Sequence, residues 1–257
     1  TAACCAEDLQ VAELGADLQR WQVPETSAMS RPEVAEIYQA LALGLGDYVR
    51  KNGFRSVLLG LSGGIDSALC LSLAADVLGP ERVLAVYMPS VHSSDLSTQL
   101  ALEQANSLGV KLIELPIADI VDSFATALTP QLGDLGHSIT AQNLQARARG
   151  VLLMALSNQQ GALLLATSNK SEMATGYSTL YGDMCGGYAP IKDVSKTLVY
   201  ALCRYRNEQA RLAGLPDAIP HGVIERPPSA ELAPGQVDQD SLPPYDILDL
   251  ILELYVE

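Results

Sequence analysis

Basic residues are scarce in this chain of 257 residues. Only 16 lysine and arginine residues stand against 30 aspartate and glutamate residues, and the formal net charge is −14. Nucleic acid is normally bound through a basic face, so a nucleic-acid partner is not expected. Any phosphate that the chain binds must be held by local N–H groups, a metal ion and a few cations.

Cysteine and histidine are also few, and long apolar runs are missing. The five cysteines are odd in number, and neither they nor the three histidines show the paired spacing of metal ligands. A zinc site or a disulfide framework is therefore not expected, and a reducing, intracellular setting is favoured. We find no signal peptide and no run that could span a bilayer. The sequence predicts a soluble, cytoplasmic protein with no membrane partner.

Apolar residues make up 48% of the sequence, which is ample for a buried core. Short apolar runs alternate with stretches of helical periodicity from residue 31 onward. Strands are expected at 56–61, 83–88, 110–115 and 162–167, and helices at 33–52, 67–78, 97–108, 117–128, 140–159 and 245–256. Near-continuous apolar strands separated by helices indicate a parallel sheet covered on both faces. The predicted class is α/β, a doubly wound parallel sheet of the Rossmann type.

Residues 1–30 follow a different pattern. Leu9–Leu14 alternates like a lone strand, and the stretch that follows shows little periodicity. A single strand without a partner cannot form a domain, so we interpret residues 1–30 as the tail of a preceding domain plus a linker. The main domain is predicted to open with a capping box between Ser30 and Glu33, with Pro32 in the first helical turn.

The segment Ser62-Gly63-Gly64-Ile65-Asp66-Ser67 is the most informative part of the sequence. Its glycines let main-chain N–H groups approach a ligand closely, and the helix start adds unpaired N–H groups and a positive dipole end. This predicts a phosphate-binding loop, although not a Walker A loop, because Ile65 stands where the lysine would be. Two alternatives stay open on this segment alone. One is an ordinary turn, and the other is the nucleophile elbow of an α/β-hydrolase that uses Ser62, with His221 as its base.

Ligands of such sheets bind beyond the carboxyl ends of the strands, where the strand order reverses. Three polar segments at strand ends are therefore the predicted rim of a site: 62–67, 89–94 and 167–172. Loops rich in serine and asparagine are also ordinary turns and helix caps, so their composition alone does not establish a function.

Longer blocks make a family resemblance specific. The 62–67 segment resembles the SGGxDS pyrophosphate loop of ATP pyrophosphatases, a group that includes GMP, asparagine and argininosuccinate synthetases. Leu165–Asp183 resembles the second signature of NAD synthetases, with 143–149, 192–197 and 226–232 matching further blocks of that family in order. The chain is thus similar to the NAD synthetase family over residues 31–257, and the resemblance implies an adenine nucleotide alpha hydrolase-like fold. Another amidotransferase of the ATP pyrophosphatase group is the alternative.

The resemblance implies ATP-dependent amidation of deamido-NAD to NAD through an adenylate, with release of AMP and pyrophosphate and with ATP and Mg²⁺ as cofactors. Leu180 resembles the glutamine-dependent members, since the ammonia-only members look to have lysine there. Residues 1–30 would then be the remnant of an upstream nitrilase-like amidase plus a linker, and Cys4 and Cys5 would not be its nucleophile. Residues 31–257 would be a synthetase domain truncated at its C-terminus, and glutamine would supply the ammonia in the full-length protein. Family members are at least dimers, so we expect a homo-oligomer.

Site residues follow from the same resemblance. The predicted metal ligands are Asp66 and Glu172, which form the predicted catalytic set together with Lys196 and Asp183. The predicted ATP-binding residues are Gly60, Ser62, Gly63, Gly64, Asp66, Ser67, Met88, Thr167, Lys196 and Ser229. The predicted deamido-NAD-binding residues are Asn143, Arg147 and Glu172.

Some of these residues have alternative roles. Asn143 and Arg147 are four residues apart and share a helix face, whereas Arg149 is expected to point elsewhere, into solvent. Asp66 has an alternative role as a helix N-cap. Asp183 is expected either to orient ammonia or to order a lid, and a mobile glycine-rich loop without substrate contact is the alternative.

Overall fold

A sheet of four parallel strands lies at the centre of the molecule. The computed structural model describes residues 13–14, 21–22 and 33–256. In this part of the chain the sheet has the spatial order β5-β4-β3-β6. Its strands are β3 (Val57–Gly60), β4 (Val83–Tyr87), β5 (Lys111–Glu114) and β6 (Leu163–Leu165). Val57 pairs with Val83 on one side and with Leu163 on the other, so β3 is an interior strand.

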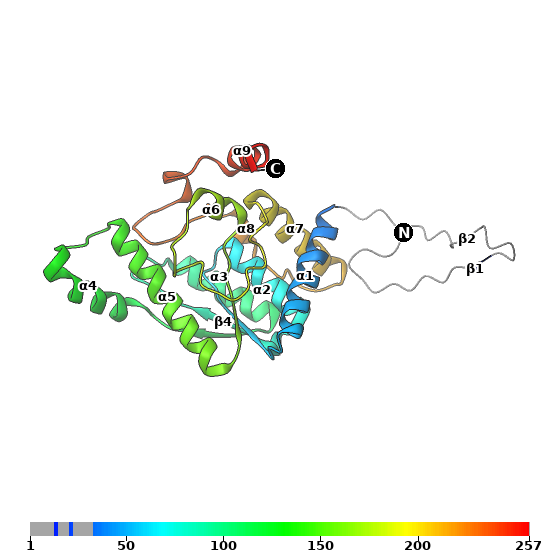
Figure 1. The fold of residues 1–257 in the computed structure, drawn as a ribbon, viewed down its shortest axis with the longest axis horizontal. Coiled ribbons are helices and arrows are strands. Elements are labelled where there is room, and N and C mark those ends of the chain that lie inside the picture. Colours follow the sequence, from blue (N-terminus) through cyan, green and yellow to red (C-terminus); the bar gives the residue numbers. More distant parts are fainter. Residues whose placement is uncertain (1–12, 15–20, 23–32, 257) are drawn as a thin grey trace.

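Helices surround this sheet (Figure 1). They are α1 (Glu33–Lys51), α2 (Ile65–Leu78), α3 (Asp95–Leu108), α4 (Ala118–Leu132), α5 (Ile139–Gln160), α6 (Lys170–Thr175), α7 (Lys196–Leu212), α8 (His221–Glu225) and α9 (Tyr245–Val256), with short 3₁₀ turns η1 (Pro80–Arg82) and η2 (Asp238–Asp240). Helices α1, α2 and α7 pack on one another, and α5 runs along β3 and β6.

Both faces of the sheet are buried at β3, β4 and β6, as the apolar runs predicted, whereas the edge strand β5 is exposed or only partly buried. Side chains alternate between the two faces of a strand. In β3, Val57 and Leu59 therefore join the core formed with α1, α2 and α7, whereas Leu58 joins a second core that includes Leu153 of α5. All three β3 side chains are completely buried. The prediction of a doubly wound α/β sheet with helices on both faces is confirmed.

The order of the strands fixes where a site can form. The chain adds β4 and then β5 on one side of β3, and α5 then returns it to the opposite side, where β6 pairs with β3. The strand order therefore reverses between β3 and β6. The loops that follow these two strands leave the same edge of the sheet, which is where open parallel sheets bind their ligands.

The start of α2 differs from the prediction in a way that matters for Asp66. The helix begins at Ile65, two residues earlier than expected, and its N-cap is Gly64. Asp66 thus lies within the first turn, and its alternative interpretation as the N-cap is wrong. The early start follows from Gly64, whose extended backbone leads directly into the helix.

The N-terminal region contains a pair of strands instead of a lone strand. β1 (Glu13–Leu14) pairs antiparallel with β2 (Trp21–Gln22), so the expectation of an unpaired strand is wrong. The partner was missed because two residues are too few to show a period. Cys4, Cys5 and the predicted capping box at Ser30 lie outside the described residues. Among the helices of the described chain, none is both long and apolar enough to cross a membrane.

Candidate functional site

The phosphate-binding loop predicted at 62–67 lies between β3 and α2. Gly63 has a φ of 79°, and a Cβ atom there would stand 2.6 Å from the carbonyl oxygen of Ser97. Both the left-handed backbone and the close approach require glycine at this position. The loop is thus packed directly against the first turn of α3.

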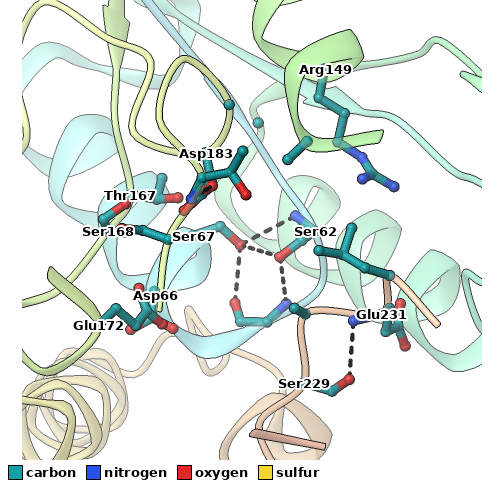
Figure 2. A pocket seen from close by; sticks show the side chains of 18 of the residues that line it. Ser62, Asp66, Ser67, Arg149, Thr167, Ser168, Glu172, Asp183, Ser229 and Glu231 are labelled. Atoms are coloured by element: carbon teal, nitrogen blue, oxygen red, sulfur yellow. Dashed lines mark hydrogen bonds between the residues drawn. The ribbon is translucent and has the colours of Figure 1, made fainter. Parts of the chain in front are cut away.

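Serine hydroxyls hold this loop in shape, as Figure 2 shows. The Oγ atoms of Ser62 and Ser67 are 3.1 Å apart, and the N–H of Gly64 donates to Ser62 Oγ at 3.1 Å. Helix α2 has no side-chain cap, which leaves its first N–H groups for an anion. Within residues 33–256 no histidine contacts Ser62, and His221 instead pairs with Glu225 on the surface. The hydrolase interpretation therefore lacks its base in the described chain.

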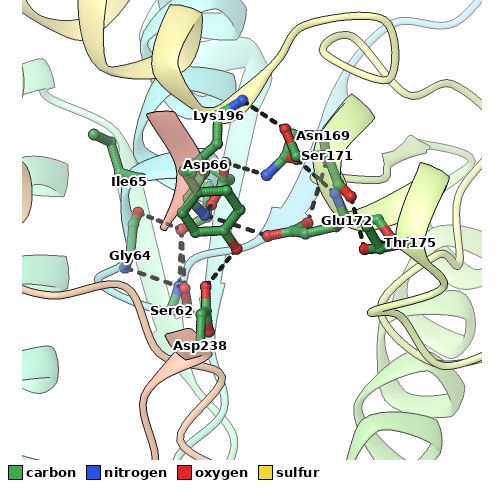
Figure 3. A network of polar contacts seen from close by, with 12 residues as sticks. Ser62, Gly64, Ile65, Asp66, Asn169, Ser171, Glu172, Thr175, Lys196 and Asp238 are labelled. Carbon is green, nitrogen blue, oxygen red and sulfur yellow. Dashed lines mark hydrogen bonds and ion pairs between the residues drawn. The ribbon is translucent and has the colours of Figure 1, made fainter. Parts of the chain in front are cut away.

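A buried lysine connects the two predicted metal ligands (Figure 3). Lys196 Nζ lies 2.6 Å from Asp66 Oδ2 and 3.3 Å from Glu172 Oε1. The lysine side chain is 2% exposed, and each carboxylate side chain is 17% exposed. Asn169 donates to Asp66 Oδ1 at 2.9 Å and forms a capping box with Glu172 at the start of α6. Residues that are 24 to 130 positions apart thus form one cluster.

The charges in this cluster strongly affect one another. Burial, followed by the negative charge of Asp66, raises the pKa of Glu172 to about 8. Burial alone would lower the pKa of Lys196, but Asp66 and Glu172 raise it well above its usual value. When all three groups are ionised, the cluster carries one net negative charge. It is therefore a favourable place for a further cation.

Helix α9, near the C-terminal end of the chain, contacts Lys196 and the starts of helices α6 and α7. Asp249 accepts hydrogen bonds from the hydroxyl of Ser171 and from the N–H of Thr197, so it connects the starts of α6 and α7. Lys196 also lies over the ring of Tyr245, 5.2 Å from its centroid. This role of Asp249 could not be predicted from the sequence, because a carboxylate within an amphipathic helix is usually solvated.

Asp183 lies in the loop that follows α6. Its Oδ1 accepts from the N–H of Thr179 at 2.7 Å, and the hydroxyl of Thr179 donates to Asn143 at 2.8 Å. Burial raises the pKa of Asp183. Asp183 therefore orders the 177–183 loop, which Thr179 connects to α5, and Asp183 also faces the cavity.

These groups line one cavity of about 610 Å³. The predicted residues that line it are Gly60, Ser62, Gly64, Asp66, Ser67, Met88, Asn143, Thr167, Glu172, Asp183, Lys196 and Ser229. Two predicted residues do not line it. Gly63 packs against Ser97, and Arg147 donates from Nε to the carbonyl oxygen of Leu180 at the surface.

Arg149 is a cavity residue that sequence reasoning missed. It was expected in solvent, but its guanidinium points into the cavity (Figure 2), and its Nε donates to the carbonyl oxygen of Met88 at 3.0 Å. Burial lowers its pKa to about 10, and no carboxylate of the described residues lies within ion-pair distance. Arg149 was expected elsewhere because it does not share a helix face with Asn143, but the cavity extends around the side of α5, past that face.

Comparisons with known proteins agree with this architecture. The family model described as NAD synthase matches residues 37–257. The glutamine-dependent NAD(+) synthetase of Xylella fastidiosa strain Temecula1 is 53% identical over 223 residues, which are 87% of this chain and 40% of the relative. The enzyme of the same name from Acinetobacter baylyi is 51% identical over 251 residues, which are 98% of this chain and 46% of the relative. The chain thus spans less than half the length of these relatives.

Solved structures show the same fold. The glutamine-dependent NAD+ synthetase of Acinetobacter baumannii, in complex with ADP, has a TM-score of 0.80 and 47% identity, covering 97% of this chain and 44% of that one. The NMN synthetase of Francisella tularensis has a TM-score of 0.76 and 28% identity, covering 87% of each chain.

Proposed function

Because the chain belongs to the NAD synthase family, we propose that it is a ligase that amidates deamido-NAD to NAD at the expense of ATP. The observation that carries this proposal is a single cavity in which a phosphate-binding loop lies beside two carboxylates and a buried ammonium group. Nucleotide binding alone does not need both Asp66 and Glu172, whereas adenylyl transfer builds up negative charge that must be neutralised. The ADP bound to the Acinetobacter baumannii relative supports a nucleotide in such a cavity.

In the first step, a carboxylate oxygen of the nicotinate group attacks the α-phosphorus of ATP. A bond forms between them, the bond from the α-phosphorus to the bridging oxygen breaks, and pyrophosphate leaves. The N–H groups at the start of α2, with the hydroxyls of Ser62 and Ser67, would hold the phosphates of the leaving group. Lys196 would offset the charge that develops on them in the transition state.

The residues present fit a magnesium ion. Asp66 and Glu172 are hard oxygen ligands held together at the cavity wall. Residues 33–256 contain no group of three or more carboxylate, cysteine or histidine ligands, so phosphate oxygens and water would complete the coordination. When bound, the ion would supply positive charge to the phosphates.

In the second step, ammonia attacks the acyl carbon of the adenylate. The new C–N bond replaces the bond from that carbon to the AMP oxygen, AMP leaves, and the nitrogen loses a proton. Asp183 faces the cavity and its pKa is raised, so its carboxylate would orient the ammonia or accept this proton. Asn143, fixed by Thr179, would contact deamido-NAD, and Arg147 would do so only from outside the cavity.

The test is to incubate the chain with ATP, Mg²⁺, deamido-NAD and ammonium. AMP and pyrophosphate should appear in amounts equal to the NAD formed, and release of ADP and orthophosphate would refute the mechanism. Nicotinate mononucleotide is the informative competitor, because an NMN synthetase is among the structural neighbours. A higher kcat/KM for the mononucleotide would reassign the substrate.

The nitrogen source is a second part of the proposal. We propose that residues 1–30 are the end of an amidase domain and that the synthetase domain occupies residues 31–257; in support, the chain spans less than half of a relative named glutamine-dependent NAD(+) synthetase. The nucleophile of that amidase would lie upstream. The chain should therefore form NAD with added ammonium and ignore glutamine. NAD formation supported by glutamine alone would contradict this assignment of residues 1–30.

We also propose a homo-oligomer. Helix α4 has an apolar side but no buried residue, and Phe124, Leu132 and, on α5, Val151 are exposed. A second copy that covers these side chains would remove apolar surface from water. Light scattering coupled to gel filtration should give at least twice the chain mass of 27.3 kDa. A cytoplasmic location is likewise part of the proposal and can be tested by cell fractionation.

A further inference from the structure

Glu231 lines the cavity and belongs to a polar cluster whose role the proposed reaction does not explain. Its Oε1 accepts hydrogen bonds from Ser94 Oγ at 2.9 Å, from Ser97 Oγ at 2.8 Å and from an N–H of Arg226 at 2.9 Å. Arg226 also donates to Ser97 Oγ at 2.7 Å. We refer to these four residues as the Glu231 cluster.

The cluster connects two segments that are far apart in the sequence. Ser94 is the N-cap of α3, and Ser97 lies in its first turn and is completely buried. Glu231 belongs to the 226–241 segment, which contributes Ser229 and other residues to the cavity wall (Figure 2). A carboxylate at a helix N-terminus is favoured by the helix dipole, and hydrogen bonds to a charged group are stronger than neutral ones. The 226–241 segment is therefore fixed to the start of α3.

The same cluster reaches the phosphate-binding loop through Ser97. The backbone of Ser97 is so close to Gly63 that a Cβ atom on Gly63 would stand 2.6 Å from the Ser97 carbonyl oxygen. A shift of the first turn of α3 would therefore displace the loop. The hydroxyl of Ser97 accepts from Arg226 and donates to Glu231, while its carbonyl abuts the loop.

The backbone of Glu231 is unusual as well. Its φ is 48°, in the left-handed region that non-glycine residues rarely adopt. Such conformations persist where the surrounding structure enforces them, and they concentrate at functional sites. Glycine would adopt this backbone more easily but would remove the carboxylate. The side chain of Glu231 is thus retained at a position where the backbone favours glycine.

We propose that Glu231 is a positioning residue for ATP. It fixes the 226–241 segment against α3 and, through Ser97, holds the phosphate-binding loop in place. The nucleotide pocket depends on this contact. The segment also meets α5, where Gln145 donates to the carbonyl oxygen of Leu232 at 3.0 Å. The predicted deamido-NAD contact Asn143, however, is held by Thr179 instead. This inference rests on the proposed amidation for the identity of the second substrate, deamido-NAD. The effect of Glu231 on nucleotide binding does not require that reaction.

Three substitutions of Glu231 separate the possible causes. Glu231→Ala removes the carboxylate and keeps the unfavourable backbone, whereas Glu231→Gly removes the carboxylate and relieves the backbone. Glu231→Gln keeps an oxygen that can accept the same three hydrogen bonds. Glu225→Ala, six positions earlier and exposed, is the matched control.

We expect Glu231→Ala and Glu231→Gly to raise the KM for ATP at least tenfold and the KM for deamido-NAD less than twofold. Glu231→Gln should stay within threefold of the unsubstituted chain, and Glu225→Ala should be unchanged. Wild-type behaviour of Glu231→Gly would overturn the proposal, because only the backbone would then matter. An equal rise in both KM values would overturn it too, since it would indicate a general loss of structure.

A binding measurement separates this inference from the proposed function. Calorimetric titration with ADP should show a dissociation constant at least tenfold higher for Glu231→Ala than for the unsubstituted chain, whether or not deamido-NAD is amidated. An unchanged constant, or no ADP binding by the unsubstituted chain, would overturn the role of Glu231. ADP binding without amidation would overturn the proposed function alone.

Arg226→Met tests the same cluster of hydrogen bonds if the Glu231→Ala variant does not fold. It removes the guanidinium from the cluster and leaves both serine contacts to Glu231, so we expect a rise of about threefold in the ADP dissociation constant. The double variant Arg226→Met with Glu231→Ala should bind ADP no more weakly than Glu231→Ala alone, because both residues act through one contact. Fully additive effects would contradict a shared contact.

Discussion

Replacing Glu172 with glutamine should stabilise the metal-free chain increasingly as the pH rises. The pKa of Glu172 is about 8 in the folded chain, against an ordinary value of 4.5. Between these values the folded state holds one more proton than the unfolded state, so the stability of the unsubstituted chain falls as the pH rises through this window. Each pH unit corresponds to about 1.4 kcal/mol, which gives a penalty on the order of 3–5 kcal/mol above pH 8. Glutamine does not ionise and avoids this penalty.

The assay is urea unfolding followed by circular dichroism, with EDTA present, at several values from pH 5 to pH 9. The difference in free energy of unfolding between Glu172→Gln and the unsubstituted chain should be near zero, within about 1 kcal/mol, at pH 5. The difference should grow toward pH 8. Glu103→Gln, on an exposed face of α3, should show a small difference that does not change with pH. A difference for Glu172→Gln that is constant, or that shrinks as the pH rises, would refute the reasoning.

The same substitution should impair the reaction. Glu172 is a proposed magnesium ligand, and loss of its charge should lower AMP release on the order of 100-fold at saturating ATP. A variant that is more stable yet much less active would show that the paired carboxylates are kept for chemistry at a cost in stability. Full activity would contradict the metal assignment.

Three further outcomes can be checked on the same chain. Ser62→Ala should weaken ATP turnover, and a fluorophosphonate probe should leave Ser62 unlabelled, because the hydroxyl is a hydrogen-bonding group; stoichiometric labelling would support a nucleophile instead. Asp66→Asn should reduce AMP release far more than Asp217→Asn, which alters only an ion pair near the surface; equal losses would count against a metal ligand. Gly63→Ala should cost at least about 2 kcal/mol in urea unfolding, because both the positive φ and the Ser97 carbonyl oppose it. Gly53→Ala has a similar φ but open space and should cost only about 1 kcal/mol, so equal costs would show that the close approach is unimportant.

The sheet could be predicted from the sequence because its signals are local. Apolar runs such as 57–60 and helical periods such as that of α1 repeat over a few residues, and they do not depend on distant parts of the chain. The predicted ends of helices and strands were less accurate. Helix α2, for example, begins at Ile65, directly after its N-cap Gly64 and two residues earlier than predicted. The strand at 21–22 was missed because a two-residue strand has no period.

The sequence by itself determined the fold class, and it predicted the phosphate-binding loop and twelve of the residues that line the cavity. The fold class depends on residue types at short, fixed spacings, whereas the cavity residues were predicted from the family resemblance. Only the tertiary structure decided that Lys196 lies between Asp66 and Glu172, that Arg149 faces the cavity, and that Glu231 holds the start of α3. Each of these contacts depends on how loops from different strands pack at one edge of the sheet. Local periodicity does not encode that packing, because the energy of a buried charge depends on partners that are distant in the sequence.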